Sequence, residues 1–241
     1  MTITLSTEAI TKTFPRYRVG VVAASGLVIP AIRPPELDAL IHEREAAARA
    51  QWQGAELSAI PGVAGWREAY KAFGIKQTRY RSSVERLVKN VLAGRELPRV
   101  NGFVDLYNAV SLAHVLPLGA DDLDRVVPPF ALRYAREDDT FVDMADAANG
   151  DGGTEPSPPK AGEVVFADAE KVLCRRWNWR QDARSLIRPD TKRAIVTVQS
   201  NGAGDVDAAV ADLAALITRF CGGRTASAIA DAANPKVSIE L

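Results

Sequence analysis

The chain has 241 residues, of which 47% are hydrophobic and 25% charged, a composition typical of a globular protein with one large or two small domains. Lysine plus arginine and aspartate plus glutamate number 30 each, so the total charge gives no indication of nucleic-acid binding. Two cysteines and two histidines exclude a disulfide framework and argue against a zinc site, and no apolar run is long enough for a membrane helix. We therefore expect a cytoplasmic protein that has no cofactor and no contact with a membrane.

The N-terminal third is predicted to contain one strand and two helices. Residues 1–16 show no clear period. The run Tyr17–Ile29 is β-branched and almost uninterruptedly apolar, which is typical of a strand buried on both faces. Glu36–Gln53 has the apolar stripe of an amphipathic helix, and Gly65–Phe73 is predicted to be a short helix.

A basic segment leads into the next predicted helix. Nine basic and three acidic residues lie between Arg67 and Arg99. Within this segment, Ser82 and Glu85 have the S-x-x-E spacing of a capping box, which predicts a helix from Ser83 to about residue 93. Two interpretations of this turn stay open, namely helix capping and a place in a ligand pocket.

The segment Leu97–Asp124 combines a turn, an apolar helix and polar side chains. Pro98 and the pair Asn101-Gly102 indicate a turn, so a helix is expected to begin near Phe103. Its apolar stripe faces a core and leaves Asn108 near the edge, where the amide can meet a ligand.

The second half of the chain is expected to be richer in strands. Three acidic residues, Asp121, Asp122 and Asp124, lack the spacing of a calcium loop and are interpreted as helix caps. The stretch 147–162 is rich in glycine, proline and small polar residues and predicts a flexible loop inside a single domain that spans 1–241. Four segments have the composition of strands: Phe130–Ala135, Val164–Ala167, Val172–Arg175 and Ala194–Val198.

At the C-terminal end, Asp205–Cys221 has the N-cap and the apolar stripe of a helix that covers a sheet. We expect a further short helix at Ala226–Ala232 and a final strand at Lys236–Leu241.

The run CRRWNWR, residues 174–180, interleaves two tryptophans with three arginines. This composition is expected where an aromatic group is stacked and a carboxylate or phosphate is held. A core strand with an arginine-rich outer face would have the same composition, and both interpretations stay open.

Catalytic signatures are missing from the sequence. No nucleophile stands beside a plausible base, and no cluster of metal ligands occurs. The sequence therefore gives no support to covalent or metal-assisted catalysis.

Six segments together carry a family resemblance: GWREAYKAFGI, KQTRYRSSVERL, VDLYN, LPLGADDLD, GEVVFAD and CRRWNWR. They resemble, in order, the tRNA-editing module of the bacterial phenylalanyl-tRNA synthetase beta subunit, its B-three/B-four region, and free-standing proteins similar to it. The resemblance covers roughly residues 65–198. It implies an α+β fold in three layers, with a sandwich-like β core of unusual topology and helices packed against one side.

The same resemblance implies a function. A free-standing editing factor would hydrolyse a mischarged aminoacyl-tRNA through a positioned water, and its partner would be the tRNA acceptor end. Such a reaction depends mainly on orientation and on a polarised carbonyl. The alternative is a non-enzymatic protein that binds an amino acid or a similar small molecule.

Asn108 stands where the family's motif has its asparagine, and Tyr107 replaces the preceding threonine. Two departures affect the implied pocket, because Gly119 takes the place of a histidine and Thr197 that of an acidic residue. The protein therefore either edits an amino acid other than tyrosine or keeps a pocket without hydrolysis.

We expect eight residues to converge on one cleft. Asn108 would orient the amino or carbonyl group, Arg175 would hold a carboxylate or phosphate, and Trp177 would be a stacking wall. The full set is Arg81, Ser82, Ser83, Tyr107, Asn108, Arg175, Trp177 and Asn178.

Binding of tRNA would draw on two basic segments, 67–99 and 171–193, if they lie on one face. The other interpretation is that both are solvated helix and strand faces.

Overall fold

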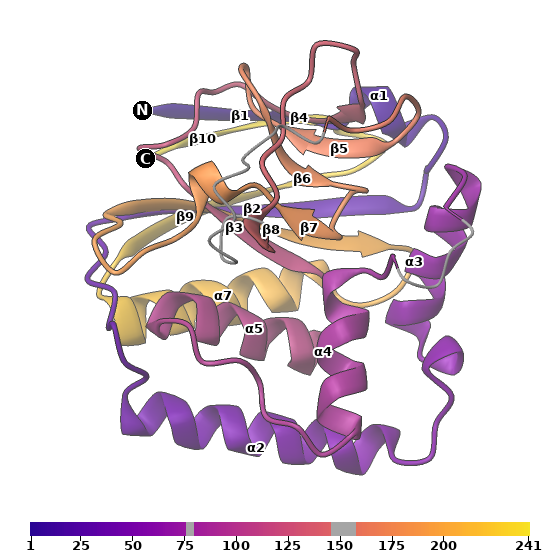
Figure 1. Cartoon of the computed structure of the whole chain (residues 1–241). Coiled ribbons are helices and arrows are strands. Elements are labelled where there is room, and N and C mark those ends of the chain that lie inside the picture. The colour runs from indigo at the N-terminus through magenta and orange to yellow at the C-terminus, as the bar shows by residue number, and fades with distance from the viewer. Residues whose placement is uncertain (76–79, 146–157) are drawn as a thin grey trace.

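Two β-sheets and a group of helices share one hydrophobic core in the computed structural model, which describes residues 1–75, 80–145 and 158–241. Figure 1 shows the strands gathered in the upper half of the molecule and most of the helices below them. The loop predicted at 147–162 lies outside the described residues up to residue 157.

The four-stranded sheet is built around β2 (Tyr17–Ser25) and has the order β3-β8-β2-β9, with every pair antiparallel. Its other members are β3 (Leu118–Asp122), β8 (Arg193–Asn201) and β9 (Arg224–Ala230). Because β2 has a strand on each side and packing on each face, its apolar run is almost fully buried. The edge strand β3 contributes residues to the cavity described below.

The six-stranded sheet has the order β10-β1-β4-β5-β6-β7. Its neighbours are antiparallel except for β1 and β4, which pair in parallel. The strands are β1 (Thr2–Ser6), β4 (Phe130–Tyr134), β5 (Val164–Ala167), β6 (Val172–Arg175), β7 (Arg180–Gln181) and β10 (Lys236–Glu240).

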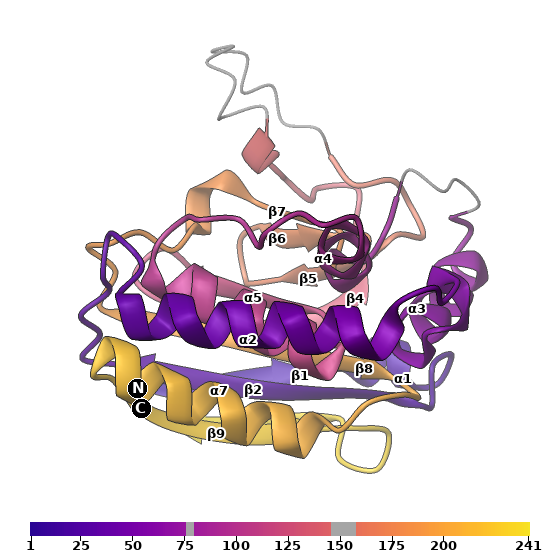
Figure 2. The same ribbon diagram turned by 90° about the horizontal axis from the view of Figure 1, so that it is seen from below.

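Helices α5 (Gly102–His114) and α7 (Val206–Cys221) cover the outer face of the four-stranded sheet, and α2 (Pro35–Trp52) packs on α5. Figure 2 shows α7 over the strands of this sheet and α2 over α5. Gly20 on β2 allows the close approach of α7, since a Cβ atom there would lie 2.3 Å from a methyl carbon of Val210.

The other helices lie at the ends of the sheets. They are α1 (Glu8–Thr11), the 3-10 turn η1 (Leu57–Ala59), α3 (Pro61–Ala72), α4 (Ser83–Leu92) and the 3-10 turn η2 (Ala183–Ser185). In Figure 1, α4 stands upright beside the end of α5, between the sheets and α2.

The α+β prediction is confirmed, with two sheets in the core and helices on one side. The four strands predicted between residues 130 and 198 correspond to β4, β5, β6 and β8, with bounds that agree within a few residues. The helices predicted at residues 36–53, 83–93 and 205–221 and the final strand agree equally well. The helix predicted from Gly65 begins earlier, at Pro61, because proline fits the first turn of a helix.

Three predictions were wrong or incomplete. The expected helix at Ala226–Ala232 is the strand β9, whose pairing with β2 overrides a weak helical pattern. Asp121 and Asp122 belong to strand β3 and do not cap a helix. Residues 1–16, which show no period, contain β1 and α1.

Candidate functional site

A cavity of about 480 Å³ lies where the β3 edge of one sheet meets the β5-β6-β7 edge of the other, with α4 and α5 over it. This volume is in the range of small-molecule sites. The polar residues lining it are Ser83, Arg86, Asn90, Glu96, Tyr107, Asn108, Asp121, Asn178, Arg180, Gln181, Thr197 and Gln199. Its apolar and aromatic wall includes Leu87, Val104, Leu118, Phe166, Cys174 and Trp179.

Four of the eight predicted site residues line this cavity: Ser83, Tyr107, Asn108 and Asn178. The other four, Arg81, Ser82, Arg175 and Trp177, do not belong to its lining. Three segments far apart in sequence, α4, α5 and the turn after β6, thus meet at one cavity.

Ser82 acts as the N-cap of α4, because its hydroxyl accepts a hydrogen bond from the Glu85 amide at 3.4 Å. Capping by Ser82 is therefore confirmed, whereas among the described residues the Glu85 carboxylate does not accept from the Ser82 amide to complete a capping box. The Glu85 carboxylate pairs with Arg81 and, at 2.7 Å, with Arg67. These contacts tie Arg81 to a buried carboxylate at the start of the helix.

Trp177 is fully buried and packs edge-on against Phe14 and Trp66, at ring-centroid distances of 4.6 and 5.2 Å. The aromatic side chain that lines the cavity is Trp179. The alternation of a strand does not continue here, since Arg176 and Trp177 have φ angles of 45° and 68° in the turn between β6 and β7.

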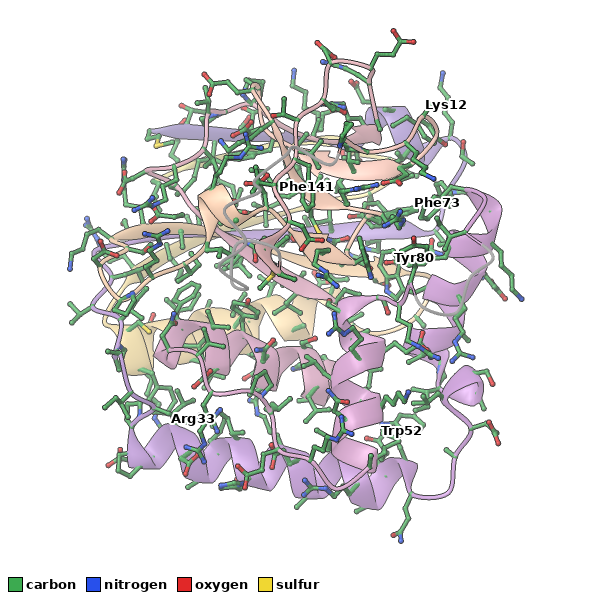
Figure 3. All side chains as sticks on the ribbon, viewed as in Figure 1. Lys12, Arg33, Trp52, Phe73, Tyr80 and Phe141 are labelled. Carbon is green, nitrogen blue, oxygen red and sulfur yellow. The ribbon has the colours of Figure 1, made fainter. Side chains whose placement is uncertain are left out.

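The arginines of the same run have partners within the protein. Arg175 is buried and pairs with Glu163 at 2.9 Å, while its guanidinium lies 5.6 Å from the ring centroid of Phe141, which Figure 3 labels. Arg176 stacks on Tyr80, also labelled in Figure 3, at 3.7 Å from the ring centroid, and on Trp179 at 4.4 Å.

A hydrogen-bonded network forms the polar side of the cavity. Gln199 accepts from the Tyr17 hydroxyl at 3.3 Å and from the Asn178 amide at 3.4 Å, and it donates to the Thr197 hydroxyl at 3.1 Å. Tyr70 donates to the Asn178 oxygen at 3.0 Å. These bonds fix the orientation of both amides, which favours a pre-organised surface.

Gly119 and Thr197 are cross-strand partners on β3 and β8, and both line the cavity. A Cβ atom built on Gly119 would have no atom within 4 Å. The two positions at which the sequence departs from the resembling motif therefore lie side by side on paired strands, and the space next to Gly119 is open.

Asp121 is a cavity residue that the sequence reasoning missed. It lies two residues after Gly119 on β3, is 4% exposed, and accepts hydrogen bonds from Ser185 at 2.6 Å and Gln181 at 3.0 Å. Burial raises the pKa of Asp121 to about 7. Reading LPLGADD as a strand, with residues 119 and 121 on one face, would have found it.

Several lining groups are available to a ligand. Among the described residues, none forms a hydrogen bond with the side-chain amide of Asn108, and the buried Ser83 hydroxyl has no partner. The hydroxyl of Tyr107 is neutral, because burial raises its pKa above the ordinary value. The arrangement can therefore bind and orient a small polar molecule.

Most of the second basic segment is neutralised within the fold. Six of its eight basic residues form ion pairs: Lys171, Arg175, Arg176, Arg180, Arg184 and Arg193. In the described part of the first segment, Arg67, Arg81 and Arg99 are paired. These charges are less available to phosphate than the sequence count implies.

Within the described ranges, no group of three or more histidine, cysteine, aspartate or glutamate residues could hold a metal ion. None of the helices in these ranges combines the length and the apolar character needed to cross a membrane.

Comparison with known proteins gives a family and a distant structural similarity. The family described as "B3/4 domain" matches residues 65–222. An N-terminal fragment of the phenylalanyl-tRNA synthetase beta-subunit from Pyrococcus horikoshii is similar with a TM-score of 0.43 and 13% identity, over 92% of this chain and 50% of that one. The chain thus spans about half the length of that fragment. No curated protein matches the chain.

Proposed function

Because the chain belongs to the B3/4 domain family, we propose that it hydrolyses the ester of a mischarged aminoacyl-tRNA in trans. The observation that carries the proposal is the position of Asn108, which has the place of the family's motif asparagine and lies in the wall of a cavity of about 480 Å³. The aminoacyl end of a tRNA is small enough for a site of this size.

In the proposed reaction, a water in the cavity adds to the ester carbonyl, and the bond between that carbon and the ribose oxygen breaks. The products are a free amino acid and a tRNA with a free hydroxyl. Asn108 and the Ser83 hydroxyl, which has no partner within the described ranges, would orient the ester and polarise its carbonyl oxygen. The carbonyl of an ester needs little further activation.

A covalent route through Cys174 is disfavoured. This thiol lies in the cavity wall, but burial raises its pKa far above the ordinary value, so it is not a thiolate at neutral pH. Direct attack by water is therefore the better-supported route.

A second candidate function is binding of an amino-acid-like molecule without hydrolysis. The observation that favours it is the open space at Gly119, beside Thr197 on the paired strand, since the resemblance implies a histidine and an acidic residue at these two positions. Loss of these groups removes polar contacts that would hold the reacting ester.

The decisive experiment incubates the protein with a panel of correctly charged and mischarged tRNAs and measures release of the amino acid. We expect at least one mischarged tRNA to be deacylated faster than in buffer, and correctly charged tRNAs to be spared. If no member of the panel is deacylated while a known deacylase acts on it, the hydrolytic proposal is wrong. Saturable binding of a free amino acid in that case would favour the second candidate.

A further inference from the structure

The two oxygens of the Asp121 carboxyl have different surroundings. Oδ1 accepts both hydrogen bonds, from Ser185 and Gln181. Within the described part of the chain, Oδ2 has no hydrogen-bond donor, although the residue is 4% exposed and lines the cavity. Since Oδ2 is not fully buried, it can accept a hydrogen bond from a group bound in the cavity.

There is room for such a group beside Oδ2. Gly119 lies two positions earlier on β3, and a side chain on it would meet no atom within 4 Å. Residues two positions apart on a strand lie on the same face of the sheet, so Gly119 and Asp121 share one face. Thr197, the cross-strand partner of Gly119, is a further lining residue of modest size.

Charged side chains of opposite sign line the cavity at different depths. Arg86 is exposed and Arg180 donates to Asp143 at 3.0 Å, whereas the Asp121 carboxyl is buried. Arg86 therefore offers positive charge near the solvent, and Asp121 offers negative charge in the interior. A molecule with a phosphate at one end and a cation at the other would match both.

Among the described residues, Asp121 has neutral hydrogen-bond donors and no ion pair. Burial makes the largest contribution to its raised pKa, and the carboxylates of Asp182 and Asp168 raise the pKa further. The hydrogen bonds from Ser185 and Gln181 act in the opposite direction. The neighbouring Tyr107 and Cys174 remain neutral because burial raises their pKa values. Asp182 and Asp168 are themselves paired with Arg184 and Lys171, so Asp121 is the carboxylate of this group that a bound cation could pair with.

We propose that the cavity binds a primary ammonium group, which donates to Oδ2 of Asp121 next to Gly119. The inference rests on the proposed function, in that the ligand would be the aminoacyl end of a tRNA. Its ammonium comes from one of two sources, the α-amino group of any aminoacyl ester or the side chain of a basic amino acid.

Titration of the protein with three amides that cannot be hydrolysed as esters tests this. Alaninamide carries only an α-ammonium, Nα-acetyl-lysinamide only a side-chain ammonium, and N-acetylalaninamide neither. Binding is measured by NMR chemical-shift changes. We expect one of the first two to bind about ten- to a hundredfold more tightly than N-acetylalaninamide, the range for a hydrogen bond to a charged group.

Asp121→Asn should remove this preference, because it keeps an acceptor for Ser185 and loses the charge. The matched control is Asp122→Asn, which alters the next carboxylate of β3, one that accepts from Thr191 and does not line the cavity. The control should keep the preference. If Asp121→Asn does not fold, the pKa of Asp121 in the unmodified protein is measured from the NMR shift of its carboxyl carbon. The preferred amide should lower this pKa.

The outcomes separate this inference from the proposed function. A preference for an ammonium that depends on Asp121, without deacylation of any tRNA, would support the inference and leave only the hydrolytic proposal refuted. Equal binding of the three amides would overturn the inference alone. The same holds if aminoacyl-tRNAs with a free and with an acetylated α-amino group are deacylated equally fast and basic side chains are not preferred.

Discussion

Asn108 combines a motif position with an amide that has no protein partner among the described residues. We predict that Asn108→Ala lowers deacylation or ligand binding at least about tenfold, because a polar contact to the ligand is lost. Stability should change by less than about 0.5 kcal/mol, since no internal hydrogen bond is broken. Deacylation rates and a urea melt of the same preparation check both parts.

The comparison variant is Asn101→Ala. Asn101 caps α5 by accepting from the Val104 amide at 3.0 Å, and its side chain does not line the cavity. This variant should lose about 1 kcal/mol of stability and keep its ligand affinity. The opposite pattern in the two variants would show that Asn108 has a structural role.

Asp121 should give the protein an unusual pH dependence of stability. Its pKa is raised to about 7 in the folded state and lies near 4 in the unfolded chain, so the folded state binds the extra proton between these values. The free energy of unfolding that Asp121 contributes is therefore fully present below pH 4. It falls by about 1.4 kcal/mol per pH unit up to about pH 7.

Urea melts of the unmodified protein and of Asp121→Asn from pH 4 to pH 8 measure this contribution as the difference between the two. Other carboxylates, such as Asp139 and Asp212, have lowered pKa values from partners other than Asp121 and titrate alike in both proteins. A difference that does not vary with pH would mean that Asp121 ionises at its ordinary value.

At single residues, the sequence indicates the segments of the site better than the side chains. Trp177 and Trp179 belong to the same short run, and the sequence does not distinguish their side chains. The turn with positive φ angles at Arg176 and Trp177 places the Trp179 ring at the cavity. Arg175 is similar, because its partner Glu163 lies in a different segment of the chain. Local patterns contain no information about either contact.

At the scale of elements, two glycines of the four-stranded sheet, on strands that both pair with β8, allow a matched prediction. A Cβ atom on Gly20 would lie 2.3 Å from Val210 of α7, whereas on Gly119 it would meet nothing within 4 Å. Gly20→Ala should therefore lower the free energy of unfolding by about 1–3 kcal/mol, because α7 must shift from β2.

Gly119→Ala should leave stability unchanged or raise it slightly, since alanine restricts the unfolded chain more than glycine does. Thermal denaturation of both variants tests the pair. Similar losses in the two would mean that the cost comes from the loss of glycine itself and that the packing of α7 has no part in it.

Elements with a strong period were predicted correctly from the sequence. The capped helices α4 and α7 and the buried strand β2 have local signals that agree with their tertiary positions. Strand β9 was taken for a helix, because its alanines favour a helix locally and its strand conformation depends on pairing with β2. Strand β3 was missed because its conformation also depends on pairing, here with β8, and Asp121 was missed with it.

At the scale of the whole molecule, the balance of 30 basic and 30 acidic residues is reflected in the ion pairs that use up most of the second basic segment. Binding of tRNA by this fold would therefore depend on a few basic side chains near the cavity. Arg86 of α4 lines it, and Lys89 lies one turn further along the same helix; both are exposed and have no ion-pair partner among the described residues.

We predict that affinity for a tRNA falls about tenfold to a hundredfold between 50 and 200 mM salt, as expected for three or four phosphate contacts. Replacing both Arg86 and Lys89 by alanine should reduce the slope of log affinity against log salt by about two, one for each lost contact. The control replaces Arg224 and Lys236, two exposed basic residues on β9 and β10. These strands are the sheet edges opposite to β3 and β7, so this variant should keep the slope. Filter binding across a salt series measures all three proteins, and an equal loss of slope in both variants would show that tRNA is attracted without preference for the face that carries the cavity.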